Sequence, residues 1–298
     1  MGDQMGDGMS RVDRIGVVGG TGLYAMAGLE IQEERTIETP FGAPSDAYAL
    51  GELDGVAVAF LPRHGRGHRL LPSELNYRAN IYGFKSLGVS RLISVSAVGS
   101  LKEGLAPSCV VVPDQFYDRT RHRRDTFFGN GLVAHVSMAD PTCPDLTATV
   151  ARLLEQQAVA HQVGGPYVCM EGPQFSTRAE SETYRSRGAD IIGMTQLQEA
   201  KLAREAEICF VCLAMVTDYD CWKVDEEAVT VEQVMGTLHA NAEAAQDLLG
   251  ALIPAVAADR ACDCSCQQAL SSALVTDFSL VPKGTLAALG LLIRPYQE

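Results

Sequence analysis

Two carboxylates stand directly after a strongly apolar stretch of the chain. The nine residues Ile208 to Val216 carry no charge, and Thr217-Asp218-Tyr219-Asp220 follows them. A run of this kind, rich in Val, Phe and Cys, predicts a strand covered on both faces. Ligands of open α/β sheets bind just past the carboxyl ends of strands. If the chain stays extended, Asp218 and Asp220 point the same way, where they can bind amino groups or, when protonated, donate to a ring nitrogen.

For a lone Asp, a solvated turn would be the better interpretation, but other predicted strands also end in ligand-type residues. Arg14 to Val18 leads into GGTG, where backbone N–H groups and the Thr21 hydroxyl can close around a phosphate or form a tight turn. Val56 to Leu61 ends in PRHGRGH, where Arg63 offers a planar fork and His64 a second donor. The glycines between these charges favour an anion site over a solvated loop.

Two more strand ends add polar groups. Arg91 to Ala97 ends with the Ser96 hydroxyl and the backbone N–H of Ala97. Tyr167 to Met170 runs into EGPQFSTR, where Phe175 can stack on a planar ring or fill the core. The basic run RTRHRRD at 119–125, taken alone, is interpreted as a solvated loop.

The elements that position these groups alternate between strand and helix, which predicts one α/β domain over residues 14–254. Residues 1–13 are predicted to be a disordered leader without a signal peptide. Residues 255–298 form a tail with a Cys-rich loop and an apolar segment that packs on the domain or on a neighbouring subunit. Apolar periodicity predicts helices over 74–87, 147–157, 179–187, 199–206 and 231–252.

The totals exclude several functions. The chain has 298 residues, 47% of them apolar and 20% charged, and a net charge of −13, which argues against nucleic acid or an anionic membrane as partner. An odd number of cysteines, nine, indicates reduced thiols and a cytoplasmic location, with the nucleus open for a eukaryote.

Three cysteines in the tail leave two interpretations open. Cys262, Cys264 and Cys266 can bind a soft metal or form a redox pair, although a zinc site usually has four ligands at other spacings. A flexible loop with incidental thiols explains them at least as well.

A second class of function is also open at this point. Gly20-x-Gly22-x-x-Ala25 fits the permissive dinucleotide fingerprint, which would predict a nicotinamide-dependent dehydrogenase. That fingerprint requires a following helix, whereas residues 33–44 are charged and rich in turn signals. It also gives no reason for RHGRGH or TDYDCW.

The ordered motifs VVGGTGLY, ETPFGAPSDA, RHGRGH, SAVGSL, DQFYDRT, EGPQFSTRAE, GADIIGMT and TDYDCW resemble those of the trimeric purine nucleoside phosphorylase superfamily. TDYDCW is similar to its methylthioadenosine phosphorylase branch, which acts on 6-aminopurines. The resemblance implies a single α/β domain with a central mixed, partly barrelled sheet flanked by helices. It further implies a homotrimer, no metal or organic cofactor, and phosphorolysis of 5′-methylthioadenosine to adenine and 5-methylthioribose-1-phosphate.

The resemblance also implies roles for individual residues. Asp218 would donate a proton to N7 of the base and Asp220 would accept from its exocyclic amine, although the two roles are exchangeable. Phosphate would contact Thr21, Arg63, His64, Ser96, Ala97 and Thr195. The nucleoside would contact Phe175, Ser176, Met194, Val231, Val234, Met235 and, from a neighbouring subunit, His135.

Two alternatives stay open beside this assignment. Gln196-Leu197-Gln198 replaces a loop that contains Pro in the family, so a phosphorylase of the same fold with a preference for 6-oxopurine nucleosides or methylthioinosine is the alternative. A purine-binding protein without activity would not explain the complete set of phosphate residues.

Overall fold

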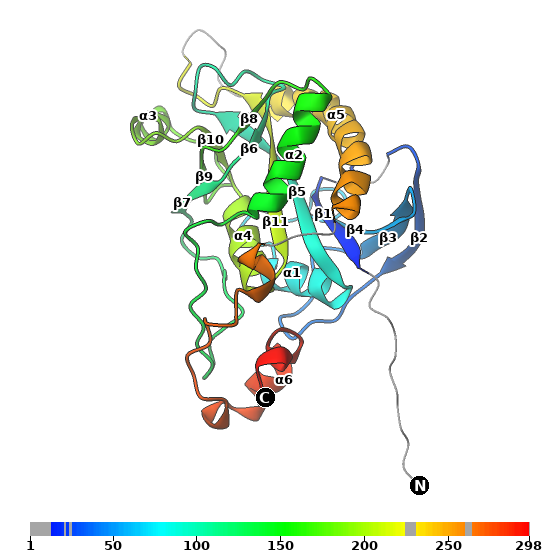
Figure 1. Ribbon diagram of the computed structural model, residues 1–298. Coiled ribbons are helices and arrows are strands. Elements are labelled where there is room, and N and C mark those ends of the chain that lie inside the picture. The colour runs from blue at the N-terminus through cyan, green and yellow to red at the C-terminus, as the bar shows by residue number, and fades with distance from the viewer. Residues whose placement is uncertain (1–12, 21, 24–25, 224–230, 260–263, 298) are drawn as a thin grey trace.

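A large mixed β-sheet with helices on both faces forms the body of the protein (Figure 1). The computed structural model describes residues 13–20, 22–23, 26–223, 231–259 and 264–297, with only the backbone of 231–241. The predicted leader therefore lies outside the described residues, apart from Asp13.

In the described residues the sheet has 11 strands. Along its main path the order is β2-β3-β4-β1-β5-β10-β9-β7, and β11 branches from β5 and leads to β6 and β8. The strands are β1 (Arg14–Gly19), β2 (Leu29–Arg35), β3 (Tyr48–Leu53), β4 (Val56–Pro62), β5 (Val89–Ser100), β6 (Val110–Val112), β7 (Gln115–Arg119), β8 (His161–Val163), β9 (Pro166–Met170), β10 (Ile191–Gly193) and β11 (Cys209–Asp218).

The α-helices are α1 (Tyr77–Ser86), α2 (Pro144–Gln156), α3 (Arg178–Ser186), α4 (Gln196–Glu205), α5 (Val231–Ala258) and α6 (Lys283–Ile293). The helices α1 to α5 follow the predicted periodicity, with shifted ends, whereas α6 was predicted only as an apolar segment of the tail. Helix α4 begins three residues earlier than predicted because Gln196, Leu197 and Gln198 are buried in its first turn. Short 3₁₀ helices lie at Ser265–Gln268, Phe278–Leu280 and Arg294–Tyr296.

The position of strand β11 between two hydrophobic cores explains why its sequence is continuously apolar. Phe210, Cys212 and Ala214 face one hydrophobic core, which contains α1 and α4. The alternate residues Val211 and Leu213 face a second core, which contains α2 and α5. Successive side chains of a strand point to opposite faces, so a strand between two helical layers needs apolar residues at every position.

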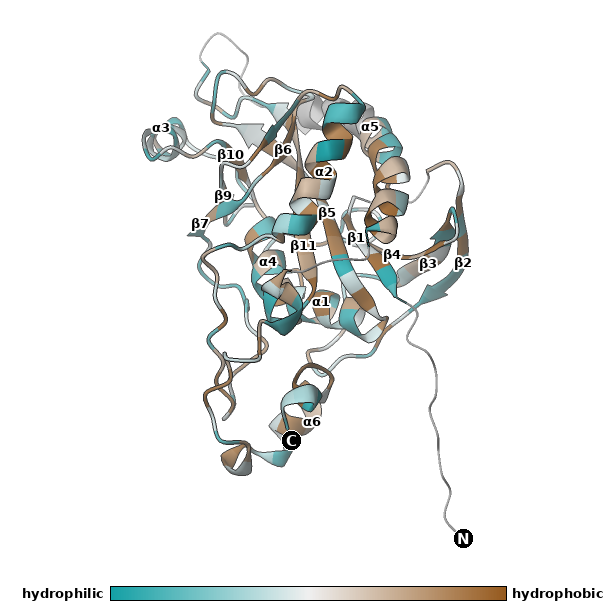
Figure 2. Cartoon of the chain, in the orientation of Figure 1, coloured by the Kyte–Doolittle hydropathy of each residue, from teal (hydrophilic) through white to brown (hydrophobic). Residues whose placement is uncertain are grey.

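The edge strand β2 differs from this centre. Its sequence LEIQEER is exposed along almost its whole length, and Figure 2 shows the strand largely hydrophilic whereas β5 and β11 carry hydrophobic residues. Charged side chains on an edge strand discourage pairing with other sheets. Among the described helices, none is long and apolar enough to cross a membrane.

The dinucleotide fingerprint is not followed by a helix. The described residues between β1 and β2 form turns, and the next element is strand β2. Because the pyrophosphate of a dinucleotide binds at the N-terminus of a helix that follows the glycines, this topology does not support a nicotinamide enzyme.

Candidate active site

Four parallel strands bring their carboxyl ends to one edge of the sheet. Strand β1 pairs in parallel with β4 and β5, and β5 pairs in parallel with β11. At this edge Gly19 lies opposite Pro62, and Asp218 lies opposite Gly99. Strand β10 runs antiparallel beside the end of β5, with Ile192 opposite Gly99, so the chain after β10 returns alongside the Ser96 region. Residues predicted from five separate motifs therefore meet at this edge.

The two carboxylates do not lie on an extended chain as predicted. Asp220 has a φ of 52°, in the left-handed region, and its N–H donates to Oδ1 of Asp218 over 2.7 Å. The Thr217 hydroxyl donates to Oδ2 of Asp218, also over 2.7 Å. The prediction of an extended chain was wrong because the Asp218 carboxylate captures the backbone two residues on and closes a turn.

The turn nevertheless keeps the acids together above a glycine. A Cβ on Gly99 would lie 3.1 Å from Oδ1 of Asp218 and 3.4 Å from Cβ of Asp220. Burial raises the pKa of the Asp220 carboxyl, and the negative charge of Asp218 raises it further, against the lowering by the Ser181 and Ser176 hydroxyls. The surroundings of Asp220 therefore favour its protonated form.

Arg63 is buried and its fork is directed at a protein carboxylate. Its Nε lies 2.5 Å from Oε1 of Glu199, and its Nη2 lies 3.1 Å from Oε2. Nη2 also donates to Ser94 Oγ over 2.6 Å, and Nη1 donates to the Val95 carbonyl over 2.9 Å. Because Nη1 carries two hydrogens, it can serve Val95 and a bound anion together. Arg63 thus joins β4 to α4 at the edge where an anion would bind.

His64 is held in one tautomer. Its Nδ1 lies 2.8 Å from the Leu70 carbonyl oxygen, so Nδ1 carries a hydrogen and donates it. Burial, and then the charge of Arg63, lower the pKa of His64 to about 4. At neutral pH Nε2 therefore accepts a hydrogen bond. The expected donation from His64 to phosphate requires that the ring take up a second proton or that the anion supply one.

Ser96 and Thr195 place hydroxyls at the same edge. The Ser96 side chain is buried, and its Oγ has no hydrogen-bond partner among the described residues. Buried polar atoms are normally paired, so this oxygen calls for a ligand or a water. Thr195 is the N-cap of α4 but makes no capping bond with its side chain. Its hydroxyl lies at a helix N-terminus, a place that favours anions. Ala97 follows Ser96 in β5 and lies opposite Met215 of β11.

The loop that was predicted to hold the base lies between β9 and α3. Phe175 is 48% exposed there, although it is a large aromatic residue. The carbonyl of Ser176 accepts a hydrogen bond from the Cys221 thiol over 3.3 Å, which joins this loop to the turn that carries Asp220. Met194 packs beneath the loop, where its sulfur lies within 2.5 Å of the position a Cβ would take on Gly172.

The basic run 119–125 is not wholly a solvated loop. The Arg123 side chain is 1% exposed, and it donates to the Met194 carbonyl, to Gln198 Oε1 over 2.9 Å and to the Glu171 carbonyl over 2.7 Å. The prediction for this residue was wrong because the tertiary fold surrounds one charge of the run with acceptors from α4 and from the residues that directly follow β9 and β10. Arg123 thereby supports both the Met194 and the Glu171 ends of the candidate site.

Several predicted residues cannot be placed at this site. Thr21 lies outside the described residues. The backbone positions of Val231, Val234 and Met235 are in the first turns of α5, but their side chains also lie outside the described part. His135 is exposed, and its N–H donates to the Ala273 carbonyl of the tail over 2.9 Å. Within this chain it therefore lies against the tail.

Comparisons with known proteins show the family of this chain. The model of the family described as "Phosphorylase superfamily" matches residues 14–254. The S-methyl-5'-thioadenosine phosphorylase of Koribacter versatilis is 57% identical over 95% of this chain and 96% of its own length. That of Geobacter sulfurreducens is 52% identical over 95% and 98%.

Solved structures show the same relationship. A methylthioadenosine phosphorylase from an Antarctic soil metagenomic library has a TM-score of 0.89 and 49% identity, over 95% of this chain and 99% of that one. The methylthioadenosine phosphorylase from Schistosoma mansoni in complex with adenine has a TM-score of 0.79 and 32% identity, over 95% and 98%. The chain thus belongs to the phosphorylase superfamily, whose α/β fold was predicted from the motifs. Within that superfamily it is a member of the S-methyl-5'-thioadenosine phosphorylase family.

Proposed function

We propose that this enzyme cleaves 5′-methylthioadenosine with inorganic phosphate and releases adenine and 5-methylthioribose-1-phosphate. The observation that carries the proposal is the carboxylate pair beside Gly99, at the same sheet edge as the ends of β1, β4 and β5, whose polar groups we assign to an anion. The names of close relatives over nearly the whole chain support the same reaction.

The proposed chemistry gives each side of the site one task. Cleavage of the bond between C1′ of the sugar and the purine nitrogen leaves positive charge on the sugar and negative charge on the base. Phosphate stabilises the cationic sugar and then forms the new bond to C1′ with one of its oxygens. We assign its binding to Thr21, Arg63, His64, Ser96, Ala97 and Thr195. In this scheme phosphate is a co-substrate, and no metal or organic cofactor takes part.

The departing purine must be neutralised at N7. Burial and the charge of Asp218 raise the pKa of Asp220, which suits the donor role, while Asp218 accepts two hydrogen bonds within the turn. This distribution favours exchange of the two roles that the family resemblance implied. A general acid of this kind contributes about 10²–10⁴-fold to a rate. The other carboxylate would accept from the exocyclic amine, a hydrogen bond that a 6-oxopurine cannot donate.

The rest of the pocket is assigned to the nucleoside. We propose that Phe175 stacks on the base, with Ser176 and Met194 beside base and ribose. The positions of Val231, Val234 and Met235 recur at helical spacing in α5 and would face the methylthio group. His135 would close this group's pocket from a neighbouring subunit of a homotrimer. A cytoplasmic location, without nucleic acid or membrane partners, belongs to the same proposal.

The decisive experiment measures base release from the purified protein, with and without phosphate, for methylthioadenosine and methylthioinosine in parallel. Phosphate-dependent release of adenine, much faster than that of hypoxanthine, is the expected result. Preference for methylthioinosine would keep the mechanism and overturn the assignment of the base. Base release that does not depend on phosphate would contradict the proposed reaction itself.

A further inference from the structure

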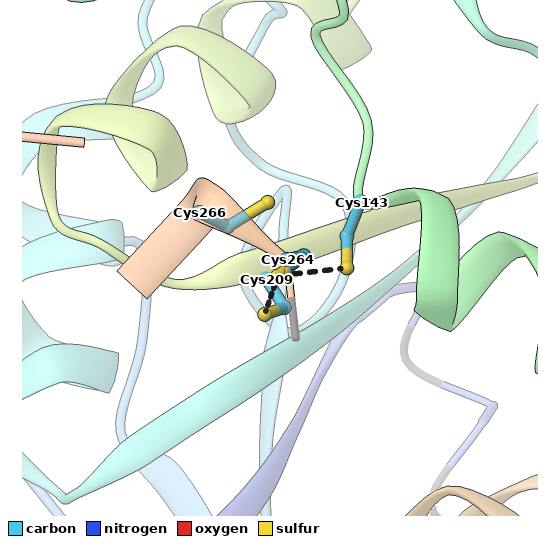
Figure 3. Close-up of side chains that lie close together, drawn as sticks. All are labelled: Cys143, Cys209, Cys264 and Cys266. Atoms are coloured by element: carbon cyan, nitrogen blue, oxygen red, sulfur yellow. Dashed lines mark hydrogen bonds between the residues drawn. The ribbon is translucent and has the colours of Figure 1, made fainter. Parts of the chain in front are cut away.

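Four cysteine sulfurs gather at the other end of β11, far from the carboxylate pair. The Sγ atoms of Cys143, Cys209, Cys264 and Cys266 all lie within 4.8 Å of one another. Figure 3 shows these four side chains gathered at one place. Cys264 Sγ lies 3.5 Å from that of Cys143 and 3.4 Å from that of Cys209. A disulfide requires about 2.05 Å between sulfurs, so neither of these two pairs is bonded.

Separate elements hold the four thiols in place. Cys143 is the N-cap of α2, and its backbone N–H donates to the Phe210 carbonyl of β11 over 2.8 Å. Cys209 is the first residue of β11. Cys264 and Cys266 come from the tail, at the start of a 3₁₀ helix (Ser265–Gln268). The cluster therefore joins three segments that are distant in the sequence.

The four sulfur donors and the distances between them match one class of metal ion. Tetrahedral zinc binds thiolate sulfur at about 2.3 Å, which places the four sulfurs about 3.8 Å apart. Cys143, Cys209 and Cys266 are buried and Cys264 is half-buried, so the position between them is enclosed by protein. Four thiols with no hard oxygen ligand select soft or borderline cations over Mg²⁺ or Ca²⁺.

Neighbouring groups suit a thiolate cluster. The Leu146 N–H donates to Cys143 Sγ over 3.5 Å, and Gln267 Nε2 donates to Cys209 Sγ over 4.0 Å. Arg204, a buried cation, interacts electrostatically with Cys266. Such second contacts orient ligands, and positive charge offsets the net negative charge of four thiolates around a divalent ion.

We propose that Cys143, Cys209, Cys264 and Cys266 form a structural site for a thiophilic divalent cation of the zinc class. Closed four-cysteine sites are structural because they leave no coordination position for a substrate. Cys209 and Asp218 are the two ends of β11, about 30 Å apart at the usual rise of a strand, so the ion takes no part in the phosphorolysis. Its role is to fasten the tail to β11 and to α2.

This inference favours the soft-metal interpretation of the tail thiols over the incidental one. In the sequence, Cys264 and Cys266 stand next to Cys262, which lies outside the described residues. This segment alone offers only three ligands at close spacing. The tertiary fold supplies the missing ligands from Cys143 and Cys209, at positions 121 and 55 residues away from Cys264.

The test uses the full chain, purified without an affinity tag under reducing, metal-free conditions, and elemental mass spectrometry. We expect about one zinc per chain in the wild type and less than about a tenth of that in Cys264→Ser and Cys143→Ser. Cys109→Ser is the matched control, because Cys109 is also buried but lies outside the cluster. It should keep the zinc of the wild type.

A second measurement uses only the wild-type protein, so its result does not depend on whether the cysteine variants fold. Cobalt added to metal-depleted wild-type protein should give the visible bands of a tetrahedral ion and a thiolate charge-transfer band, and zinc should displace them. Absence of both bound zinc and these bands would overturn the proposal. So would equal zinc in Cys264→Ser and the wild type, or a disulfide among the four cysteines in protein purified with thiols protected.

Discussion

At the residue scale, the site depends on how the surroundings of similar side chains set their protonation. Asp218 and Asp220 lie in one turn, yet burial and the neighbouring charge raise the pKa of Asp220, while Asp218 accepts hydrogen bonds from Thr217 and Asp220. His64 illustrates the opposite direction, since burial and Arg63 lower its pKa. Each side chain is thus assigned a role by its surroundings and not by its type.

We expect Asp220→Asn to lower kcat/KM for methylthioadenosine by about 10²-fold or more, because an amide cannot supply the proton. The ratio of methylthioadenosine to methylthioinosine turnover should stay near that of the wild type, because Asp218 is the proposed acceptor of the exocyclic amine. Steady-state kinetics with both substrates measures the two effects. A fall of this ratio in Asp220→Asn would assign the amine to Asp220 and contradict the exchange of roles.

His64 should make stability depend on pH in a defined window. Its pKa is about 4 in the folded protein, below the ordinary value of 6.5 for a histidine, so the unfolded chain binds more protons between these values. The stability from a neutral His64 is therefore complete above pH 6.5 and is lost as the pH falls toward 4. Urea unfolding at several pH values in this window gives the free energy of unfolding as a function of pH. The slope of this free energy against pH should be smaller in His64→Gln than in the wild type, by up to about 1.4 kcal/mol per pH unit. Equal slopes in both proteins would contradict the role of burial.

At the element scale, α4 is fastened to the sheet by a buried ion pair. Arg63 and Glu199 have side chains only 4% and 2% exposed, and Ser94 donates to the same carboxylate over 2.6 Å. The pair fixes the N-terminal half of α4, and with it Thr195, against β4 and β5. The residues assigned to phosphate binding and the position of α4 thus depend on the same network of contacts.

Arg63→Ala should consequently cost stability as well as phosphate affinity. Loss of one partner leaves Glu199 buried and unpaired, which costs about 3–5 kcal/mol. Arg66→Ala is the matched control, because the pair between Arg66 and Glu34 has a similar distance of 2.6 Å but lies on the surface with side chains 41% and 53% exposed. Its removal should cost about 0–1 kcal/mol.

Chemical unfolding of the two variants gives these energies, and kinetics on Arg63→Ala gives the effect on substrates. We expect KM for phosphate to rise far more than KM for the nucleoside. Equal rises would mean that Arg63 only supports the structure. A stability loss as small as that of Arg66→Ala would contradict the inferred burial of the Glu199 charge.

At the scale of the whole molecule, the tail presents apolar side chains to solvent. Val133 and Val275 are exposed, and Val275 donates its N–H to the Val133 carbonyl over 3.0 Å, beside His135. Leu289, Leu292 and Ile293 of α6 pack into the core of their own domain. An exposed apolar stretch next to a residue assigned to a neighbouring active site is consistent with the proposed trimer.

We expect light scattering on the purified protein to give three times the chain mass of 31.9 kDa. Val275→Glu should shift the protein toward the monomer, because it places a charge in the proposed interface. Val163→Glu is the control, since Val163 is also an exposed valine but lies in β8, away from α6 in Figure 1. A monomeric wild type, or equal effects of the two substitutions, would contradict this interface.

Sequence patterns alone predicted the strands β1, β4, β5, β9 and β11 and the motifs at their ends, since apolar runs depend on local side-chain periodicity. The strands β2, β3, β7 and β8 and the order of strands in the sheet were not predicted. The continuous apolar run of β11 predicted a strand buried on both faces, and the ordered motifs predicted the family. These features need no knowledge of contacts between distant residues.

Only the tertiary structure decided which charges are paired and which groups meet. Arg63 meets Glu199 across 136 residues, Arg123 is buried by acceptors from three elements, and Cys143 and Cys209 join the tail thiols. The turn at Asp220 likewise depends on one side-chain hydrogen bond. Such contacts depend on where the fold brings separate segments together and on burial, which local periodicity does not encode.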